Sequence, residues 1–198
     1  KIQCIVLKYS QDTCKENKAL KYSDEVEWIV TNPRRNTFIK DLTLSLKGNT
    51  LVLYNFVEKH GAPLYKIISD AVEKERKVFF VSGSVNAETR ENIRASTEKE
   101  ENAIIIASYG TFSTGVNIRN LHNVIFTSPS KSRIRNLQSI GRGLRKGNKK
   151  SSAVLYDIAD DLRYKQYQNF AIRHFYERIN IYNEEKFDFK INEIKLYN

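Results

Sequence analysis

Apolar, β-branched runs recur along the middle of the chain and alternate with segments of helical periodicity. The runs are Leu51–Phe56, Val78–Val81, Ala103–Ala107, Asn123–Thr127 and Ala153–Asp157. Because they are continuously apolar, they predict strands buried on both faces, as in a parallel sheet. Helices are predicted between them, over Leu64–Lys74, Ala87–Lys99 and Arg133–Arg145. This alternation predicts an α/β domain with right-handed crossovers.

The first 45 residues have a different pattern. A strand-like run, Ile2–Leu7, is followed by a polar loop, Ser10–Lys18, and then by a predicted helix over Thr37–Lys47. The Thr37 hydroxyl is the expected N-cap of that helix. We interpret residues 1–45 as a segment that connects to an upstream domain, and residues 46–161 as the α/β domain.

The last part of the chain, residues 162–198, is predicted to be a small extension. Aromatic and aliphatic side chains recur every three or four residues from Leu162 to Tyr182, which is typical of an amphipathic helix. Phe187, Phe189 and Ile191 then alternate with polar residues, as in a short edge strand.

Charge narrows the choice of partners. Lys and Arg outnumber Asp and Glu by 33 to 23, a formal net charge of +10 over 198 residues. This excess favours polyanionic partners. Cys4 and Cys14 fit no zinc pattern, and a reducing compartment is the simplest interpretation. The three histidines are scattered, and no metal site is expected. The acidic group in YDIADD, Asp157 to Asp161, is expected to cap the helix that follows a strand.

The stretch QSIGRGLRKGNKK, residues 138–150, carries the clearest candidate chemistry. Arg142 and Arg145 are three residues apart and would project from one face of a helix, while Gly141 allows a close approach of the backbone. Arginine suits bidentate contact with phosphate oxygens. Taken alone, however, the pair is also what a solvated basic helix face looks like.

The wider pattern resembles superfamily 2 helicases. The sequence Q-x-x-G-R-x-x-R resembles their motif VI, ASYGTFSTGVNIRNLHNVIF resembles motif V, and LVLYNF resembles motif IV. VFFVSGSVNAETREN resembles the strand, S-G turn and helical arginine of the same family. Nearly the whole chain is similar to the C-terminal half of phage UvsW-type helicases. The resemblance implies a RecA-like parallel sheet flanked by helices, with a small C-terminal helical extension.

The resemblance also implies roles for particular residues. In motif VI, Arg145 would be the arginine finger, Arg142 its partner at the phosphates and Gln138 a polar positioning residue, with Gly141 beside the nucleotide. In motif V, Gly115 would allow close approach and Asn117 stands where many relatives have a ribose-binding Asp. An amide can also form a hydrogen bond with a ribose hydroxyl.

A second group is expected to contact nucleic acid. Its members are Asn55, Ser82, Gly83, Arg90, Ser108, Thr111 and Ser113. All of them except Arg90 follow the predicted strands, where ligands bind in parallel α/β sheets. Arg90 is included because the resemblance implies it as the helical arginine of the family. The turn at Ser82 and Gly83 runs into a helix near Asn86, whose free N–H groups favour an anion. Ordinary turn capping is the alternative for the serines and threonines.

The sequence contains no G-x-x-x-x-G-K-[ST] loop and no DExH or DEAD tetrapeptide. ATP with Mg²⁺ would therefore be bound mainly by an N-terminal RecA-like lobe that is not part of this chain, and this chain alone is expected to be inactive. The expected partners are that lobe and DNA, branched or single-stranded, with RNA–DNA hybrids, in a cytoplasmic setting. Two alternatives stay open: a non-catalytic nucleic-acid-binding or annealing module, and the motor lobe of a restriction or repair enzyme.

Overall fold

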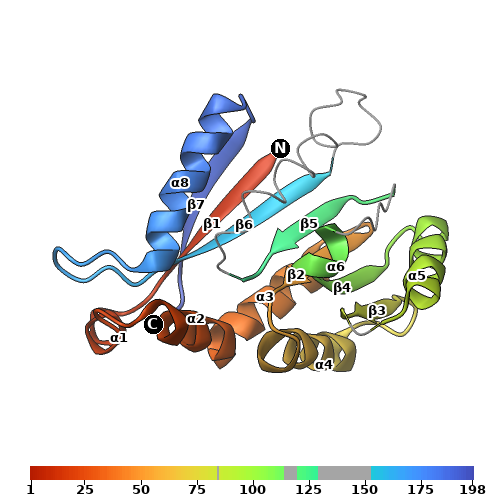
Figure 1. Ribbon diagram of the computed structural model, residues 1–198, viewed down its shortest axis with the longest axis horizontal. Coiled ribbons are helices and arrows are strands. Elements are labelled where there is room, and N and C mark those ends of the chain that lie inside the picture. The colour runs from red at the N-terminus through yellow and green to blue at the C-terminus, as the bar shows by residue number, and fades with distance from the viewer. Residues whose placement is uncertain (84, 114–119, 129–152) are drawn as a thin grey trace.

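The computed structural model describes residues 1–83, 85–113, 120–128 and 153–198. All strands in these ranges run parallel in one sheet of seven, in the order β3-β4-β2-β5-β6-β1-β7 (Figure 1). The strands are β1 (Ile2–Lys8), β2 (Thr50–Tyr54), β3 (Val78–Val81), β4 (Ile104–Ser108), β5 (Asn123–Phe126), β6 (Val154–Asp161) and β7 (Phe189–Lys195). This parallel sheet flanked by helices is the α/β architecture that the sequence pattern predicts, and the five predicted central strands are all present.

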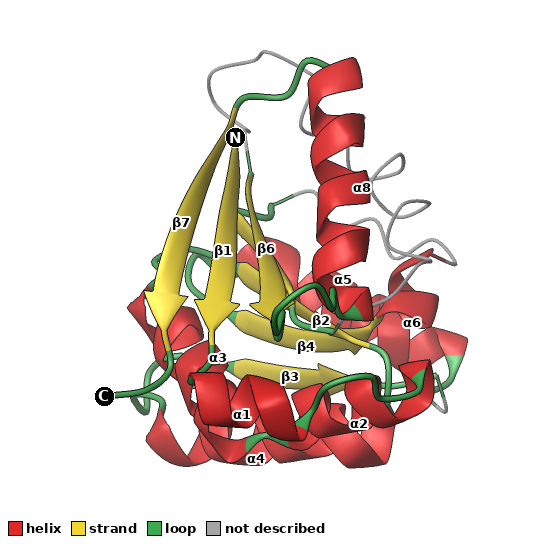
Figure 2. Ribbon diagram, turned by 90° about the vertical axis from the view of Figure 1, so that its left-hand side faces the viewer, coloured by secondary structure: helices red, strands yellow, loops and turns green. Residues whose placement is uncertain are grey.

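Helices cover both faces of the sheet. They are α1 (Gln11–Glu16), α2 (Tyr22–Thr31), α3 (Pro33–Ser45), a π-helical turn η1 (Val57–Gly61), α4 (Ala62–Ala71), α5 (Ala87–Lys99), α6 (Tyr109–Ser113) and α8 (Phe170–Glu184). Figure 2 shows α1 to α4 on the side of the sheet away from α8. The predicted helices over Leu64–Lys74 and Ala87–Lys99 are confirmed as α4 and α5, whereas Arg133–Arg145 lies outside the described residues.

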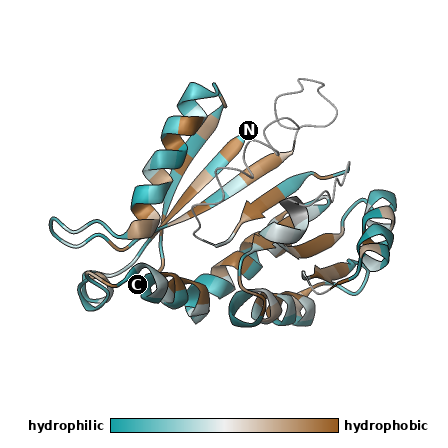
Figure 3. Ribbon diagram, viewed as in Figure 1, coloured by the Kyte–Doolittle hydropathy of each residue, from teal (hydrophilic) through white to brown (hydrophobic). Residues whose placement is uncertain are grey.

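The continuous apolar runs are explained by two cores, one on each face of the sheet. Along each strand successive side chains point to opposite faces, so a strand between two layers of helices needs apolar residues at every position. Leu53 and Phe126 belong to the core under α8 and α6, while Val52 and Ile125 belong to the core under α2, α3 and α4. Figure 3 shows hydrophobic strands between helices whose outer sides are hydrophilic.

The terminal segments contribute to the same sheet. β1 lies between β6 and β7, and β7 is the edge strand predicted around Phe189. Cys4 and Cys14 are both free thiols and buried. The division of the chain at residues 45 and 161 stays a prediction about domain organisation. None of the helices in the described ranges is long and apolar enough to cross a membrane.

The predicted start of the helix over Thr37–Lys47 is wrong. α3 begins at Pro33, and Asn32 caps it by accepting a hydrogen bond from the Arg35 N–H at 3.1 Å, so Thr37 lies inside the helix. Proline suits the first helical position because its missing N–H would have no partner there. The predicted polar loop after Ser10 is largely helix α1, which Ser10 caps.

The C-terminal helix also starts later than predicted, at Phe170 instead of Leu162. The Glu25 carboxylate from α2 accepts hydrogen bonds from the backbone N–H groups of Phe170, at 3.0 Å, and Ala171, at 2.8 Å. A distant acid thus takes the place of a local cap and satisfies two of the donors that a helix start leaves free.

Candidate functional site

The carboxyl ends of four neighbouring strands bring most of the predicted nucleic-acid residues to one edge. Asn55 follows β2, Ser82 and Gly83 follow β3, and Ser108 ends β4. Ser128 follows β5 by two residues. Because β3, β4, β2 and β5 are consecutive and parallel in the sheet, these residues share the edge at which such sheets bind ligands.

Ser108 and Thr111 form a local cap for the short helix α6. The two hydroxyl oxygens lie 2.7 Å apart, and the Ser108 hydroxyl accepts a hydrogen bond from the Thr111 N–H at 3.2 Å. Both residues are buried. The capping alternative is therefore what the structure contains at this position, and a contact with nucleic acid stays a prediction.

The turn after β3 runs into α5 as expected. Ser82 is buried and Gly83 is exposed, and a Cβ added at Gly83 would meet no atom within 4 Å. Asn86 caps α5 by accepting a hydrogen bond from the Thr89 N–H at 2.8 Å, and Arg90 is half-buried one turn into the helix. One N–H group that was expected to favour an anion is thus occupied by the protein itself.

The nucleotide side of the predicted site lies outside the described residues. This applies to Gly115, Asn117, Gln138, Gly141, Arg142 and Arg145. Ser113 is the last residue of α6, but only its backbone belongs to the described part of the chain.

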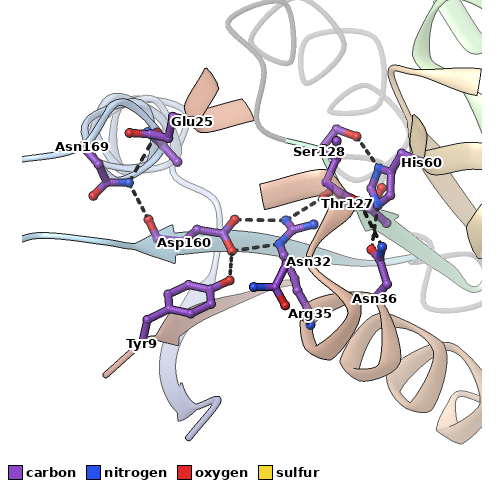
Figure 4. Close-up of polar contacts among 12 residues, drawn as sticks. Tyr9, Glu25, Asn32, Arg35, Asn36, His60, Thr127, Ser128, Asp160 and Asn169 are labelled. Carbon is purple, nitrogen blue, oxygen red and sulfur yellow. Dashed lines mark hydrogen bonds and ion pairs between the residues drawn. The ribbon is translucent and has the colours of Figure 1, made fainter. Parts of the chain in front are cut away.

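Ser128, which directly precedes the segment with the predicted arginines, is held by a chain of buried polar contacts (Figure 4). Its hydroxyl oxygen accepts a hydrogen bond from the Asn55 N–H at 3.2 Å and lies 3.0 Å from His60 Nδ1. His60 Nε2 lies 3.1 Å from Asn36 Oδ1, and the Asn36 Nδ2 donates to the Val30 carbonyl at 2.9 Å.

These contacts fix the direction of every proton in the chain. Since the Asn36 amide nitrogen is used by Val30, its oxygen faces His60 and must accept from Nε2–H. Nδ1 of His60 then has no proton and accepts from the Ser128 hydroxyl, whose oxygen accepts in turn from Asn55. Burial, helped by the charge of Arg35, lowers the pKa of His60 well below 6.5, so the ring stays neutral.

A buried ion pair holds the preceding residue, Thr127. Arg35 donates from Nε and Nη2 to the two carboxylate oxygens of Asp160 at 2.8 and 3.0 Å, and from Nη2 to the Thr127 carbonyl at 2.6 Å. The Tyr9 hydroxyl donates to Asp160 at 2.6 Å. Burial lowers the pKa of Arg35, but the charge and hydrogen bonds of Asp160, together with Tyr9 and Tyr109, raise it overall, so the guanidinium remains charged.

The two limbs of this arrangement come from consecutive residues of α3. Arg35 fixes the backbone of Thr127, and Asn36, through His60, fixes the side chain of Ser128. Figure 4 shows both limbs converging on the end of β5. Their combined effect is to define where the chain leaves β5, immediately before residue 129.

The prediction that Asp157, Asp160 and Asp161 cap a helix is wrong. All three lie within β6, because this strand continues to Asp161. Asp157 pairs with Arg178 at 2.7 Å and Asp160 pairs with Arg35. Although burial raises the pKa of Asp161, hydrogen bonds from Arg163 and Lys8 lower it overall. The three carboxylates are thus taken up by cationic partners of the chain itself.

The sequence pattern gave no direct sign of Arg35, Asn36 and His60 as a polar network. A usable signal did exist, because Arg35, Ile39 and Thr43 are four residues apart and all three are buried on one face of α3. An arginine on a buried helical stripe needs an acid, and the strand AVLYDIADD offers surplus carboxylates.

Comparison with known proteins agrees with this architecture. Residues 34–147 match the helicase conserved C-terminal domain. The chain is 33% identical over 209 residues to the ATP-dependent DNA helicase UvsW of enterobacteria phage T4, which covers 99% of this chain and 41% of that protein. The crystal structure of T4 UvsW matches all of this chain, and 42% of that one, with a TM-score of 0.86.

A more distant match concerns the fold alone. The C-terminal domain of the DEAD-box protein Dbp5 is 11% identical and superimposes with a TM-score of 0.57, covering 98% of this chain and 90% of that one. By contrast, the chain spans only about two fifths of the length of T4 UvsW.

Proposed function

Because the chain belongs to the family of helicase conserved C-terminal domains, we propose that it is the second RecA-like lobe of an ATP-dependent DNA helicase or translocase. Its substrates would be branched DNA and RNA–DNA hybrid intermediates of recombination, repair and replication. The observation that carries the proposal is the position of Asn55, Ser82, Gly83 and Ser108 at the carboxyl edge of a parallel sheet, together with the 33% identity to T4 UvsW.

In this proposal the ATP site is completed by a first lobe. The sequence of this chain has no phosphate-binding loop, and the β6 carboxylates are bound to Arg35, Arg178 and Lys8. They are therefore poorly suited to Mg²⁺, which prefers free carboxylate oxygens beside the substrate phosphates. We assign ATP and Mg²⁺ mainly to the first lobe, with the groups near Gly115, Asn117 and Gly141 closing the nucleotide from this side.

Arg145 would stabilise the charge that develops on the γ-phosphate, with Arg142 on the phosphates and Gln138 positioning them. Closure of the lobes around ATP and opening after hydrolysis would move the protein along the nucleic-acid backbone. Asn55, Ser82, Gly83, Arg90, Ser108, Thr111 and Ser113 would belong to the track that holds this backbone, without reading its sequence.

The test is DNA-stimulated ATP hydrolysis by the complete protein that contains this chain. Arg145→Ala should lower kcat roughly 10³-fold, the lower end of what an arginine finger supplies, with little change in ATP affinity. Lys150→Ala removes a charge from the same basic stretch and is the matched control, for which we expect nearly unchanged turnover. Equal losses of ATP binding and turnover in Arg145→Ala would contradict the finger role.

The separated chain supplies a second measurement. Residues 1–198 alone should not hydrolyse ATP, with or without DNA. Robust DNA-stimulated turnover would refute the assignment of half a site to this chain. DNA binding by the complete unaltered protein without any ATP hydrolysis would instead favour a non-catalytic nucleic-acid-binding or annealing module.

A further inference from the structure

A short hairpin connects β6 to α8. The backbones of Tyr164 and Tyr167 exchange two hydrogen bonds, of 3.1 and 2.9 Å, which leaves Lys165 and Gln166 exposed at the tip. In Figure 1 this connection projects from the body of the domain beside α1. It lies outside the helicase-like motifs of the chain.

The backbone at this place is strained. Among the described residues only three other than glycine have a positive φ: Ala19 at 58°, Lys165 at 50° and Lys186 at 55°. Ala19 and Lys165 belong to the same region, because Lys18, which precedes Ala19, contacts the Tyr164 ring of the hairpin. Glycine or asparagine would adopt these angles at lower cost, so a lysine at a hairpin tip sacrifices stability. Such outliers concentrate at functional positions.

Two ammonium groups share one aromatic ring at this hairpin. Lys18 Nζ lies 5.9 Å and Lys165 Nζ lies 5.4 Å from the centre of the Tyr164 ring. Within the described ranges neither ammonium has an ion pair, and the buried acids close by are already occupied, Asp161 by Arg163 and Glu25 by α8. Two cationic groups that contact the same ring concentrate positive charge at this hairpin, and such a concentration of charge attracts an anion.

The hairpin extends the carboxyl edge of the sheet. It follows β6, and α1, which precedes Lys18, follows β1. Both therefore lie on the same edge as Ser82 and Asn55, but toward the opposite end of the strand order. An extended polyanion that runs along this edge would reach both regions.

We propose that Lys165, Lys18 and the Tyr164 ring form a contact for the phosphodiester backbone of nucleic acid. The partner class rests on the proposed function, but the site is separate from every helicase-like motif in the chain. The two ammonium groups neutralise phosphate charge without reading bases, and the tyrosine ring holds them in place. The strained turn presents Lys165 beyond the surface of the domain.

The experiment compares Lys165→Gly with Lys186→Gly in the complete protein. Both replace an exposed lysine of nearly the same φ and remove one charge, but Lys186 lies at the other end of α8. Both variants should have a raised Tm, because glycine relieves the strain. Binding to a single-stranded oligonucleotide is measured by fluorescence anisotropy over a range of salt concentrations.

Only Lys165→Gly should weaken binding, by about fivefold in 0.1 M salt, and lower the slope of log K against log salt by about 0.7. Lys165→Asn, which tolerates the same φ, should reproduce this loss. Equal effects of Lys165→Gly and Lys186→Gly on binding would overturn the proposal. So would a lowered Tm in Lys165→Gly, since the side chain would then support the hairpin itself. If the unaltered protein bound no DNA, the proposed function would fail first.

Discussion

Two buried clusters on β6 have nearly the same chemistry but different surroundings. Asp157 and Asp160 are three residues apart, so they point to opposite faces of the sheet. Asp157 binds Arg178, at 2.7 and 2.9 Å, and the Tyr182 hydroxyl, at 2.6 Å. Asp160 binds Arg35 and Tyr9 at closely similar distances. In each cluster the aspartate accepts hydrogen bonds from Nε and Nη2 of one arginine and from the hydroxyl of one tyrosine.

The difference lies in what else the arginine contacts. Arg178 comes from α8 and joins this helix to its own face of the sheet, whereas Arg35 continues to the Thr127 carbonyl at the end of β5. The Nη1 of Arg35 is buried and has no hydrogen-bond partner among the described residues. The Asp157 cluster thus holds α8 on the sheet, whereas the Asp160 cluster also holds the backbone at the end of β5. The same side-chain chemistry therefore acts only locally at Asp157, but at Asp160 it also positions a neighbouring strand.

The largest expected effect tests whether the clusters are energetically alike. Arg35→Ala and Arg178→Ala each leave a buried carboxylate without its cation, which costs about 3–5 kcal/mol of unfolding free energy. Urea unfolding, monitored by circular dichroism, measures this loss of unfolding free energy in each variant. Hydrogen exchange then separates the two clusters, because only Arg35→Ala should expose the Asn55 N–H beyond the global loss. Equal exposure of this amide in Arg178→Ala would refute the role of Arg35 in positioning the end of β5.

A smaller effect is expected from the phenols. Tyr9→Phe and Tyr182→Phe keep the buried ring and remove one hydrogen bond to a carboxylate, which contributes about 1.5–3 kcal/mol. Burial and the adjacent aspartate raise the pKa of both tyrosines well above 10, so both are donors at neutral pH. The same unfolding experiment measures the loss. If both variants were as stable as the wild type, neither hydroxyl would be contributing to its cluster.

Local patterns predicted the fold well but could not predict these clusters. A run such as Ala103–Ala107 is apolar at every position because helices cover both faces, and this shows within five letters of sequence. Arg35 and Asp160, which form one of the clusters, are 125 residues apart in the sequence. A carboxylate in AVLYDIADD looks like a water-facing cap until the distant arginine is known, which is why the capping prediction failed.

The candidate site shows the same limit. The motif-like segments predicted which residues follow the strands, because parallel strands end at one edge of the sheet. The polar chain that fixes Ser128 could not be found this way. His60 and Asn36 come from η1 and α3, and their contacts depend on how these elements pack. Sequence motifs therefore predict which edge of the sheet carries the candidate site. The side chains that hold this edge in place, such as His60 and Asn36, can be identified only from the packed structure.

The smallest expected effect concerns pH and distinguishes the clusters by their neighbours. The folded protein keeps His60 neutral because burial lowers its pKa, whereas the unfolded chain binds a proton below about 6.5. Stability should therefore fall as the pH drops through this value, by at most about 1.4 kcal/mol per pH unit from this residue. In His60→Gln the slope should be shallower between pH 6.5 and 5, as measured by urea unfolding at each pH. Tyr182→Phe changes the Asp157 cluster and leaves His60 in place, so this variant should keep the wild-type slope. If His60→Gln had the same slope as the wild type, protonation of His60 would not be coupled to folding. The polar chain to Ser128 would then not depend on a neutral imidazole.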